Sequence, residues 1–398
     1  MKRREFLRGT AAGVLGGLGM TLAACAGAPA APPAGGGATA PASGSGAAEP
    51  TAAGAQAPAQ GSSLPAVEWR MGTSWPVSLD TIYGGATVLA ERVGELSSGM
   101  FKITPFPAGE LFPGLEVLQN VQQGTVEAGH SALYYYVGLN QAWGIATALP
   151  FGLTAPQQNA WLYHGGGNEA LDKLAAQFGT IVFPAGNTGT QMGGWWRTEI
   201  NSLADVQGVK LRIPGLGAQV WQRLGVVTQT LPGGEIFQAL STGAVDAAEW
   251  VGPYDDLKLG LPDAAQFYYS PGWWEPGPSL HAIANLDAWN KLPVEYQRFF
   301  KVAAWESNMN MIAKYEALNG TALSEILAGG KVQKKTYSDE ILTAAQKAAF
   351  ELFEETAAST PEFKEIYEPW KKFRETIYGW NSANESTFTN FVYQNPVS

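Results

Sequence analysis

The chain of 398 residues has only one cysteine and three histidines, and these scarcities disfavour several kinds of function. One cysteine cannot form an internal disulfide, and it offers no cysteine partner for a metal site. His130, His164 and His281 lie far apart and show none of the short spacings of zinc sites. The sequence also lacks a P-loop, a Gly-x-Ser-x-Gly nucleophile elbow and a Gly-x-Gly-x-x-Gly phosphate loop. Because these catalytic signatures are missing, we expect that the protein is not an enzyme.

Charge is also scarce, and its sign excludes one class of partner. Charged residues make up 15% of the chain, below the usual quarter, whereas aromatic residues make up 11%. Residues 1–24 hold four basic residues and one acidic residue; without them, 21 basic and 34 acidic residues leave a net charge of −13. Such an acidic chain is a poor partner for nucleic acids or anionic lipids, so we expect neither.

The single cysteine, Cys25, ends the sequence Leu22-Ala23-Ala24-Cys25, which is typical of a bacterial lipobox. Before it, the pair Arg3-Arg4 and a short run rich in Gly and Ala are typical of a twin-arginine (Tat) export signal. We therefore expect residues 1–24 to be a signal peptide that is removed, and Cys25 to carry a lipid. The alternative for this segment is an uncleaved N-terminal membrane helix.

Residues 25–64 are predicted to consist of this lipidated cysteine and a disordered tether that follows it. After Cys25 the segment consists almost entirely of Ala, Pro, Gly, Ser and Thr. Such a composition cannot bury enough apolar surface to offset the entropy lost on folding. We expect the folded part to begin near residue 65 and to meet the membrane only through the lipid. Its location would be the periplasm or the cell exterior.

From Val67 onward, strand-like and helix-like segments alternate. Apolar residues alternate over 67–71 and 101–103, whereas the 4-3-4-3 spacing from Ile82 to Leu96 predicts a helix. The order strand, helix, strand, helix, strand up to residue 132 favours a parallel sheet with helices on its faces. The same order returns between residues 209 and 247, so we predict an α/β fold.

One junction recurs in both halves of the chain. Residues 118–128 and 237–247 each predict a helix, a glycine that ends it, and a strand opening with Gly-x-Val-acid-Ala. One such match could arise by chance, but with the repeated order it indicates two similar lobes, which commonly bind a small ligand between them. The expected division is lobe 1 at 65–186 with part of 252–292, lobe 2 at 187–251 with part of the C-terminal helices, and a mainly helical region at 293–398 that could mediate dimerisation.

Two charged features are candidates for catalysis or ligand binding. Asp255-Asp256 is the best adjacent carboxylate pair, and it fits either acid–base catalysis or, more simply, an acidic helix N-terminus. Arg212 ends an alternating apolar strand just before Pro214-Gly215, where a guanidinium could give two hydrogen bonds to a carboxylate. A structural ion pair with an acidic neighbour fits the position of Arg212 equally well.

The most distinctive pattern lies between residues 186 and 278. It includes Gln191-Met192-Gly193-Gly194-Trp195-Trp196, Lys210-Leu211-Arg212-Ile213-Pro214-Gly215, Glu249-Trp250-Val251-Gly252-Pro253 and Trp273-Trp274-Glu275-Pro276-Gly277. These segments closely resemble the solute-binding subunits of tripartite ATP-independent periplasmic (TRAP) transporters, the DctP family, and the resemblance extends from Trp69 to about Trp380. It implies a two-lobed periplasmic-binding-protein-like fold with a hinge and a transport function.

Within that family, the chain resembles the subgroup that binds 2-oxo or 2-hydroxy monocarboxylates, such as pyruvate or lactate, through a bound cation. The resemblance implies that Arg212 binds the ligand carboxylate. It places a bridging cation, Na⁺ or Ca²⁺, at Gln191, Glu249, the main chain around Trp250, and Glu275. Hard cations prefer such oxygen donors, and a 2-oxo or 2-hydroxy acid adds two neighbouring oxygens of its own.

The ligand-binding set implied in this way is Arg212, Gln191, Trp250, Tyr135, Phe151 and Glu275. Trp250 and Phe151 would be walls, and Tyr135 is the first choice among Tyr134, Tyr135 and Tyr136 for a hydroxyl contact. The implied partners are the TRAP permease subunits and, by resemblance alone, a second copy bound through the C-terminal helices. A lipid anchor departs from a freely diffusing periplasmic receptor.

Two alternatives belong to other classes. One is an ABC-type or other binding lipoprotein for a different small solute such as a sugar, whose Trp-rich cleft would stack on the ligand without needing Arg212. The other is a lipid-anchored hydrolase or lyase that uses Glu275 or Asp255. An enzyme would convert its ligand, whereas a receptor would return it unchanged.

Overall fold

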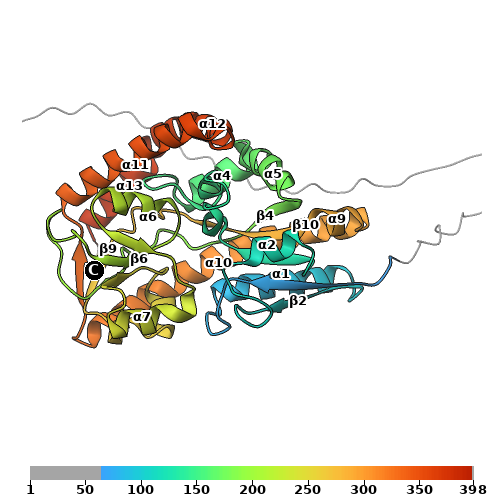
Figure 1. The fold of residues 1–398 in the computed structure, drawn as a ribbon, viewed down its shortest axis with the longest axis horizontal. Helices are drawn as coiled ribbons and strands as arrows, with labels where there is room; N and C mark the ends of the chain where they lie inside the picture. Colours follow the sequence, from blue (N-terminus) through green and yellow to red (C-terminus); the bar gives the residue numbers. More distant parts are fainter. Residues whose placement is uncertain (1–63, 397–398) are drawn as a thin grey trace, which may run out of the picture. The chain divides into compact units, whose positions relative to one another are not determined.

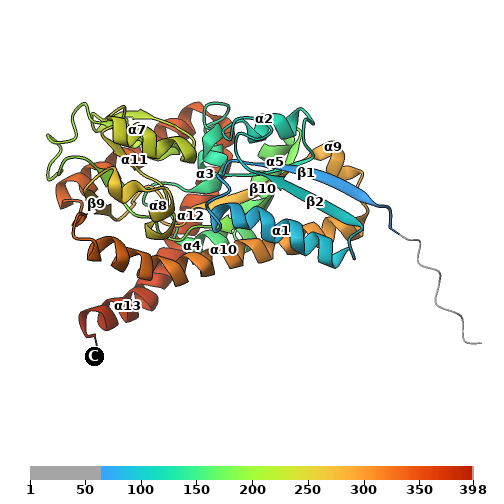
Figure 2. The same cartoon turned by 90° about the horizontal axis from the view of Figure 1, so that it is seen from below.

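The computed structural model describes residues 64–396, which Figures 1 and 2 show in two views. The predicted signal peptide, the lipidation of Cys25 and nearly all of the tether lie outside these residues. Within 64–396, no helix is both long and apolar enough to cross a membrane.

The first sheet has five strands in the order β2-β1-β3-β10-β4. β1 (Val67–Thr73) pairs in parallel with β2 (Phe101–Phe106) and with β3 (Ala128–Ser131). β10 (Ser279–Asn285) runs antiparallel to β3 and to β4 (Thr180–Asn187). The prediction of a parallel sheet, which covered the first three strands, is therefore confirmed. β10 runs antiparallel because it returns from the other sheet and enters in the opposite direction.

Two helices connect the parallel strands of this sheet. α1 (Ile82–Leu96) buries the predicted face, except that Leu96 at its end is exposed. α2 (Val117–Gln122) leads into β3. On one face of the sheet, Trp69 packs edge-on against Phe101, with the ring centres 5.1 Å apart.

The second sheet has six strands in the order β11-β9-β5-β8-β6-β7. β6 (Lys210–Arg212) is parallel to β7 (Val227–Gln229) and to β8 (Ala247–Ala248). The other three strands are β5 (Trp195–Trp196), β9 (Phe267–Ser270) and β11 (Gln333–Thr336). β5 is antiparallel to its neighbours β8 and β9, and β11 is parallel to β9.

The two sheets share one connection order, which confirms the predicted repeat. Each sheet contains three parallel strands that are linked by helices, and the first of the three in the chain lies in the middle. β1 lies between β2 and β3, and β6 lies between β7 and β8. In the second set of three, α6 (Gly215–Arg223) and α7 (Ile236–Thr242) take the places of α1 and α2. Gly124 and Gly243, the predicted helix-ending glycines, have φ of 70° and 76°, the left-handed conformation that glycine adopts most easily.

Three connections run between the sheets. Two are the segments from β4 to β5 and from β9 to β10, which we call the crossing segments, and the third is the helical connection from β10 to β11. We call the parts built on the first and second sheets lobe 1 and lobe 2. The long helix α10 (Val294–Ala328) contacts α1 and β4 of lobe 1 and also α8 (Pro253–Lys258), which follows β8 (Figure 2). The crossing segments and α10 therefore join the lobes.

The region from residue 293 is mainly helical, as predicted, with β11 inside it. α11 (Asp339–Ser359) packs on α6, and α12 (Pro361–Ala383) packs on α4 and α5 (Figure 1). α13 (Glu385–Gln394) buries none of its residues. The remaining elements are α3 (Trp143–Thr147), α4 (Ala155–His164), α5 (Gly167–Gln177), α9 (Leu286–Asn290) and the 3-10 turns η1 (Leu133–Tyr136), η2 (Gly233–Glu235) and η3 (Leu261–Asp263).

Candidate ligand-binding site

Arg212 and Glu249 meet at the carboxyl ends of two adjacent parallel strands. Arg212 ends β6 and pairs with Ala248, which ends β8. Glu249 comes next, and its main-chain N–H donates to the carbonyl oxygen of Arg212 at 3.2 Å. Their side chains are each 1% exposed and form an ion pair. In α/β folds, ligands commonly bind at this edge of a sheet.

The guanidinium of Arg212 is already engaged by the protein. Its Nη1 donates to the main-chain oxygen of Glu249 at 3.0 Å and to the Glu249 carboxylate. Its Nε and Nη2 donate to the carbonyl oxygen of Leu231 at 3.0 and 2.7 Å. The ring of Trp250 lies 5.4 Å from the guanidinium carbon, a cation–π contact. The ion pair that was the alternative for Arg212 therefore exists, and a ligand carboxylate would have to compete with Glu249.

Gln191 and Glu275 come from the two crossing segments. They lie side by side because the Gln191 N–H donates to the Glu275 carbonyl oxygen at 3.1 Å. The side-chain amide of Gln191 donates to Thr188 Oγ1 at 3.0 Å, which leaves its Oε1 facing away. Within residues 64–396, Gln191 Oε1 and Glu275 Oε2 are buried and accept no hydrogen bond. Buried acceptors without donors are costly, and a bound cation or water would satisfy them.

The electrostatics of this cluster also favour a cation. Burial raises the pKa of Glu249, and the charge of Arg212 offsets this only in part. Burial, reinforced by repulsion from Glu249, raises the pKa of Glu275 well above its usual range. Among the described residues, no group of three His, Cys, Asp or Glu side chains is placed to hold a metal. A cation here would therefore need the amide oxygen of Gln191 and other oxygens besides the two carboxylates, a donor set that fits Na⁺ or Ca²⁺.

Lobe 1 supplies the opposite wall. Tyr134 and Tyr135 lie in η1, directly after β3, with their rings 4.9 Å apart. Trp75 follows the end of β1 and is 1% exposed. Gly215 of lobe 2 makes room for this wall: a Cβ there would lie 2.4 Å from Tyr134 Cδ2, and its φ of 67° also favours glycine.

Side chains from both lobes line a cavity of about 10 Å³, about the space that a single water molecule needs. The lining residues are Trp75, Ile82, Tyr134, Tyr135, Thr188, Gln191, Arg212, Glu249, Trp250, Val251, Pro278 and Leu280. We call this space the interlobe cavity. A ligand of several heavy atoms therefore fits only when the lobes part or the lining side chains move.

The sequence of residues 71–360 matches the DctP family, described as bacterial extracellular solute-binding protein, family 7. The chain belongs to this family. It is 59% identical over 331 residues to the monocarboxylate 2-oxoacid-binding periplasmic protein of Nostoc sp., a match that covers 83% of this chain and 90% of that protein.

Solved structures of TRAP solute-binding proteins have the same fold. A TRAP transporter solute-binding protein of Bordetella bronchiseptica is 45% identical with a TM-score of 0.82, covers 83% of this chain and 98% of its own, and is described as a dimer with calcium and picolinate in one site. One from Pseudoalteromonas atlantica is 33% identical with a TM-score of 0.78, covers 82% and 99%, and holds sodium and pyruvate. The predicted family and two-lobed fold are confirmed.

Most residues predicted for this DctP-family site come together. Gln191, Arg212, Glu249, Trp250 and Tyr135 all line the interlobe cavity, and Glu275 adjoins it through Gln191. The three tyrosines separate: Tyr134 joins Tyr135 at the cavity. The hydroxyl of Tyr136 instead lies 2.9 Å from Ser131 Oγ and accepts from the main chain of Leu118 at 3.1 Å in the core. The ligand and cation roles of these residues stay predictions.

Phe151 is placed elsewhere, so its predicted ligand contact has no support in this geometry. Its ring stacks on Trp273 at 5.1 Å, and its N–H donates to the Trp273 carbonyl oxygen at 2.7 Å. Its own carbonyl oxygen accepts from Arg374 and Tyr378 of α12. Phe151 therefore ties a lobe 1 loop to the β9–β10 crossing and to α12.

Sequence reasoning missed Trp75 and Thr188 as lining residues. Trp75 stands two positions after the end of β1, so the rule that ligands bind beyond the carboxyl ends of strands could have found it. Thr188 directly follows β4 and orients Gln191 through its hydroxyl. Its location depends on the path of the crossing segment, which no local pattern reveals.

Asp255 and Asp256 do lie in the first turn of α8, but they are buried structural groups. Asp255 accepts from Tyr315 at 2.7 Å and from the indole of Trp250 at 3.3 Å. Asp256 accepts from the hydroxyl of Tyr268 at 2.6 Å and from an indole at 2.9 Å. Asp255 thereby fixes the ring of Trp250 beside the interlobe cavity.

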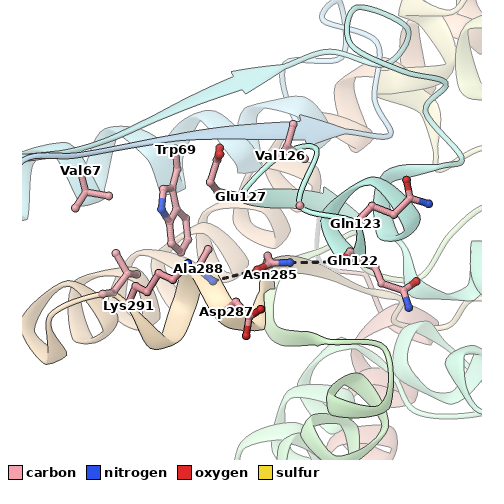
Figure 3. Close-up of a pocket in the computed structure, with 12 residues that line it drawn as sticks. Val67, Trp69, Gln122, Gln123, Val126, Glu127, Asn285, Asp287, Ala288 and Lys291 are labelled. Carbon is pink, nitrogen blue, oxygen red and sulfur yellow. Dashed lines mark hydrogen bonds between the residues drawn. The ribbon is translucent and has the colours of Figure 1, made fainter.

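A second hollow lies at the amino end of β1, away from these residues (Figure 3). Trp69, Glu127, Asn285 and Lys291 are among its lining residues. The side chain of Asn285 donates to the Val121 carbonyl oxygen at 2.9 Å and caps α9. The hollow contains none of the residues predicted to bind ligand.

Proposed function

We propose that this DctP-family protein captures a small 2-oxo or 2-hydroxy monocarboxylate, such as pyruvate, for a TRAP transporter. The observation that carries the proposal is the buried Arg212 at a strand end, which lines one cavity with Gln191. Gln191 adjoins Glu275, and within residues 64–396 Gln191 Oε1 and Glu275 Oε2 are buried and accept no hydrogen bond. The Nostoc relative is named for 2-oxoacids, and the Pseudoalteromonas structure holds pyruvate with sodium. Both support the substrate class.

In this proposal Arg212 binds the ligand carboxylate through charge-assisted hydrogen bonds. Gln191, Glu249, Glu275 and the main chain at Trp250 would hold Na⁺ or Ca²⁺, which supplies positive charge to the carboxylate and the neighbouring oxygen. The Glu249 carboxylate must leave Arg212 before the ligand takes its place. Tyr135 would donate to the ligand, and the aromatic walls would exclude water.

We further propose that residues 1–24 direct export and that Cys25 is lipidated, which mass measurement of the mature N-terminal peptide would check. The lipobox and twin-arginine patterns support this proposal. The anchor would hold the receptor near the TRAP permease subunits on the periplasmic or outer side of the membrane. A homodimer is supported only by the dimer of the Bordetella relative.

Replacement of Arg212 tests the binding site. With Arg212→Ala we expect the affinity for pyruvate, measured by calorimetry with saturating Ca²⁺, to fall by about 2–5 kcal/mol, the range for truncating a buried charge pair. Arg223 forms an ion pair with Glu355 at the surface, so Arg223→Ala should bind like the unaltered protein.

Two further measurements make this test decisive. Circular dichroism must show that Arg212→Ala remains folded, because the change also leaves the buried Glu249 without its partner. Unaltered affinity in a folded Arg212→Ala protein would reject the site. NMR of the bound sample should return pyruvate unchanged, whereas conversion would favour the hydrolase or lyase alternative.

A further inference from the structure

The interlobe cavity has an apolar side that the carboxylate and cation contacts do not use. It is formed by Trp75, Ile82, Trp250, Val251, Pro278 and Leu280. A 2-oxo acid bound as proposed directs its carboxylate and 2-oxo oxygen to the polar groups around Arg212. Its carbon chain must therefore lie against this apolar side, where contacts decide which chain lengths fit.

Trp75 is the large lobe 1 member of this apolar side. Its ring centre lies 6.4 Å from that of Trp250 at an interplanar angle of 71°, and 6.2 Å from that of Tyr135. The two indoles come from different lobes and meet edge to face, a favourable arrangement for aromatic rings. When the lobes are closed, Trp75 therefore occupies the space into which a longer chain would extend.

His130 of β3 fixes the orientation of Trp75. The indole N–H donates to His130 Nδ1 at 2.7 Å, and His130 Nε2 lies 3.1 Å from the carbonyl oxygen of Ala185 in β4. Burial lowers the pKa of His130 to about 4, so at neutral pH the ring accepts at Nδ1 and donates from Nε2. The Ala185 oxygen also accepts from Ser307 of α10 at 2.7 Å. The indole is thus anchored to two strands and to the helix that joins the lobes.

We propose that Trp75, held by His130, sets the length of the carbon chain that the interlobe cavity accepts. Trp75 is the specificity-determining residue and His130 a positioning residue. This inference rests on the proposed function, because it assumes a 2-oxo acid anchored at Arg212. The indole cannot move aside without breaking a buried hydrogen bond, so each carbon added beyond pyruvate opposes closure of the lobes.

The test measures, by calorimetry with saturating Ca²⁺, how the affinity changes with the length of the ligand's carbon chain. We call this dependence the chain-length profile. The ligands are pyruvate, 2-oxobutanoate, 2-oxopentanoate and 4-methyl-2-oxopentanoate. For the unaltered protein we expect affinity to fall with each added carbon, by about tenfold or more between the first and last ligands. In Trp75→Ala this fall should disappear or reverse, and in Trp75→Phe it should become shallower.

Matched variants separate specificity from general damage. Trp69 is a buried tryptophan of β1, the strand that precedes Trp75, and it lies outside the interlobe cavity, so Trp69→Phe should keep the original profile. His130→Leu should flatten the profile, because the indole loses its acceptor. His130→Gln should restore it, because the amide can accept from Trp75 and donate to Ala185. If His130 were merely structural, His130→Leu would lower stability, and His130→Gln would not restore the chain-length profile.

The outcomes distinguish the inference from its premise. If the unaltered protein binds none of these acids, the proposed function is wrong. If it binds pyruvate while folded Trp75→Phe and Trp75→Ala keep the original chain-length profile, only the role of Trp75 is rejected. If Trp75→Ala does not fold, the profile of Trp75→Phe decides.

Discussion

Glu249 has two competing partners in the proposed site. Its carboxylate accepts a hydrogen bond from Arg212, and the same carboxylate is a proposed cation ligand. When Glu249 turns to a cation, Nη1 of Arg212 becomes available to a ligand carboxylate. Cation and ligand should therefore favour each other's binding, and by the same factor in both directions.

Glu249→Gln is expected to remove most of this cation dependence. In the unaltered protein, chelation of Ca²⁺ in sodium-free buffer should weaken pyruvate binding about 5- to 150-fold, the usual range of coupling between two sites. In the variant the neutral amide competes weakly for Arg212 and attracts a cation poorly. Affinity with Ca²⁺ should fall, and the ratio of dissociation constants without and with Ca²⁺ should approach one in calorimetry.

A surface glutamate provides the control for this prediction. Glu355 pairs with Arg223 at 2.6 Å on the surface, so Glu355→Gln removes the same charge without touching the cavity. It should keep the full cation dependence. If Glu249→Gln also keeps it, Glu249 does not link the two ligands.

At the scale of elements, local patterns predicted what local physics determines. Alternation and helical spacing located β1 and α1, and the glycines at 124 and 243 marked the ends of two helices. The directions of β9 and β10 were not predictable in this way, because they depend on where a strand returns after crossing between sheets. The strands β5 and β8, with two residues each, are also too short to show a period.

The candidate site was also only partly predictable from the sequence. The strand-end position made Arg212 a candidate, but only the family resemblance joined it to Gln191, Glu249 and Glu275. Nothing in the sequence indicated that Leu231 would accept from Arg212, since β7 first has to bring that loop beside β6. Contacts between lobes, such as Trp75 with Trp250, depend on the hinge rather than on either segment.

A bridge between lobes is expected to slow ligand release. Asp80, just before α1, accepts from Lys258 of α8 and at 2.7 Å from Lys314 of α10. Although partial burial opposes the charged form, the hydrogen bonds from Lys258 and Lys314 lower the pKa of Asp80 to about 2. Ile82, two residues after Asp80, lines the interlobe cavity.

Lys258→Ala should therefore speed pyruvate dissociation a few-fold in stopped-flow measurements. An exposed ion pair contributes about 0.2–1 kcal/mol, and added salt should reduce the difference from the unaltered protein. Lys331 forms a more exposed ion pair with Asp263 at 3.6 Å, and neither residue lines the cavity, so Lys331→Ala is the control for loss of a surface lysine. Equal release rates for the two variants would show that the bridge does not hold the lobes closed.

For the whole molecule, the residues of the proposed site come together only where both lobes and both crossing segments meet. Lobe 1 provides Trp75 and Tyr135, lobe 2 provides Arg212, and the crossing segments provide Gln191 and Glu275. Arg212, Gln191 and Glu275 are each at most 5% exposed. A ligand can therefore enter only when the lobes part, and hinge motion at the crossing segments is the expected route.

Because ligand and cation join the same lobes, together they should stabilise the protein more than the sum of their separate effects. A ligand that binds only the folded state contributes about 2.7 kcal/mol at a hundred times its dissociation constant, and in the proposed site Ca²⁺ would lower that constant for pyruvate. In thermal unfolding followed by fluorescence, pyruvate should raise the midpoint much more with Ca²⁺ than with a chelator in sodium-free buffer. Arg212→Ala should retain only the shift due to Ca²⁺. Strictly additive shifts in the unaltered protein would mean that the two sites are independent, and Glu249 could not be the group that links them.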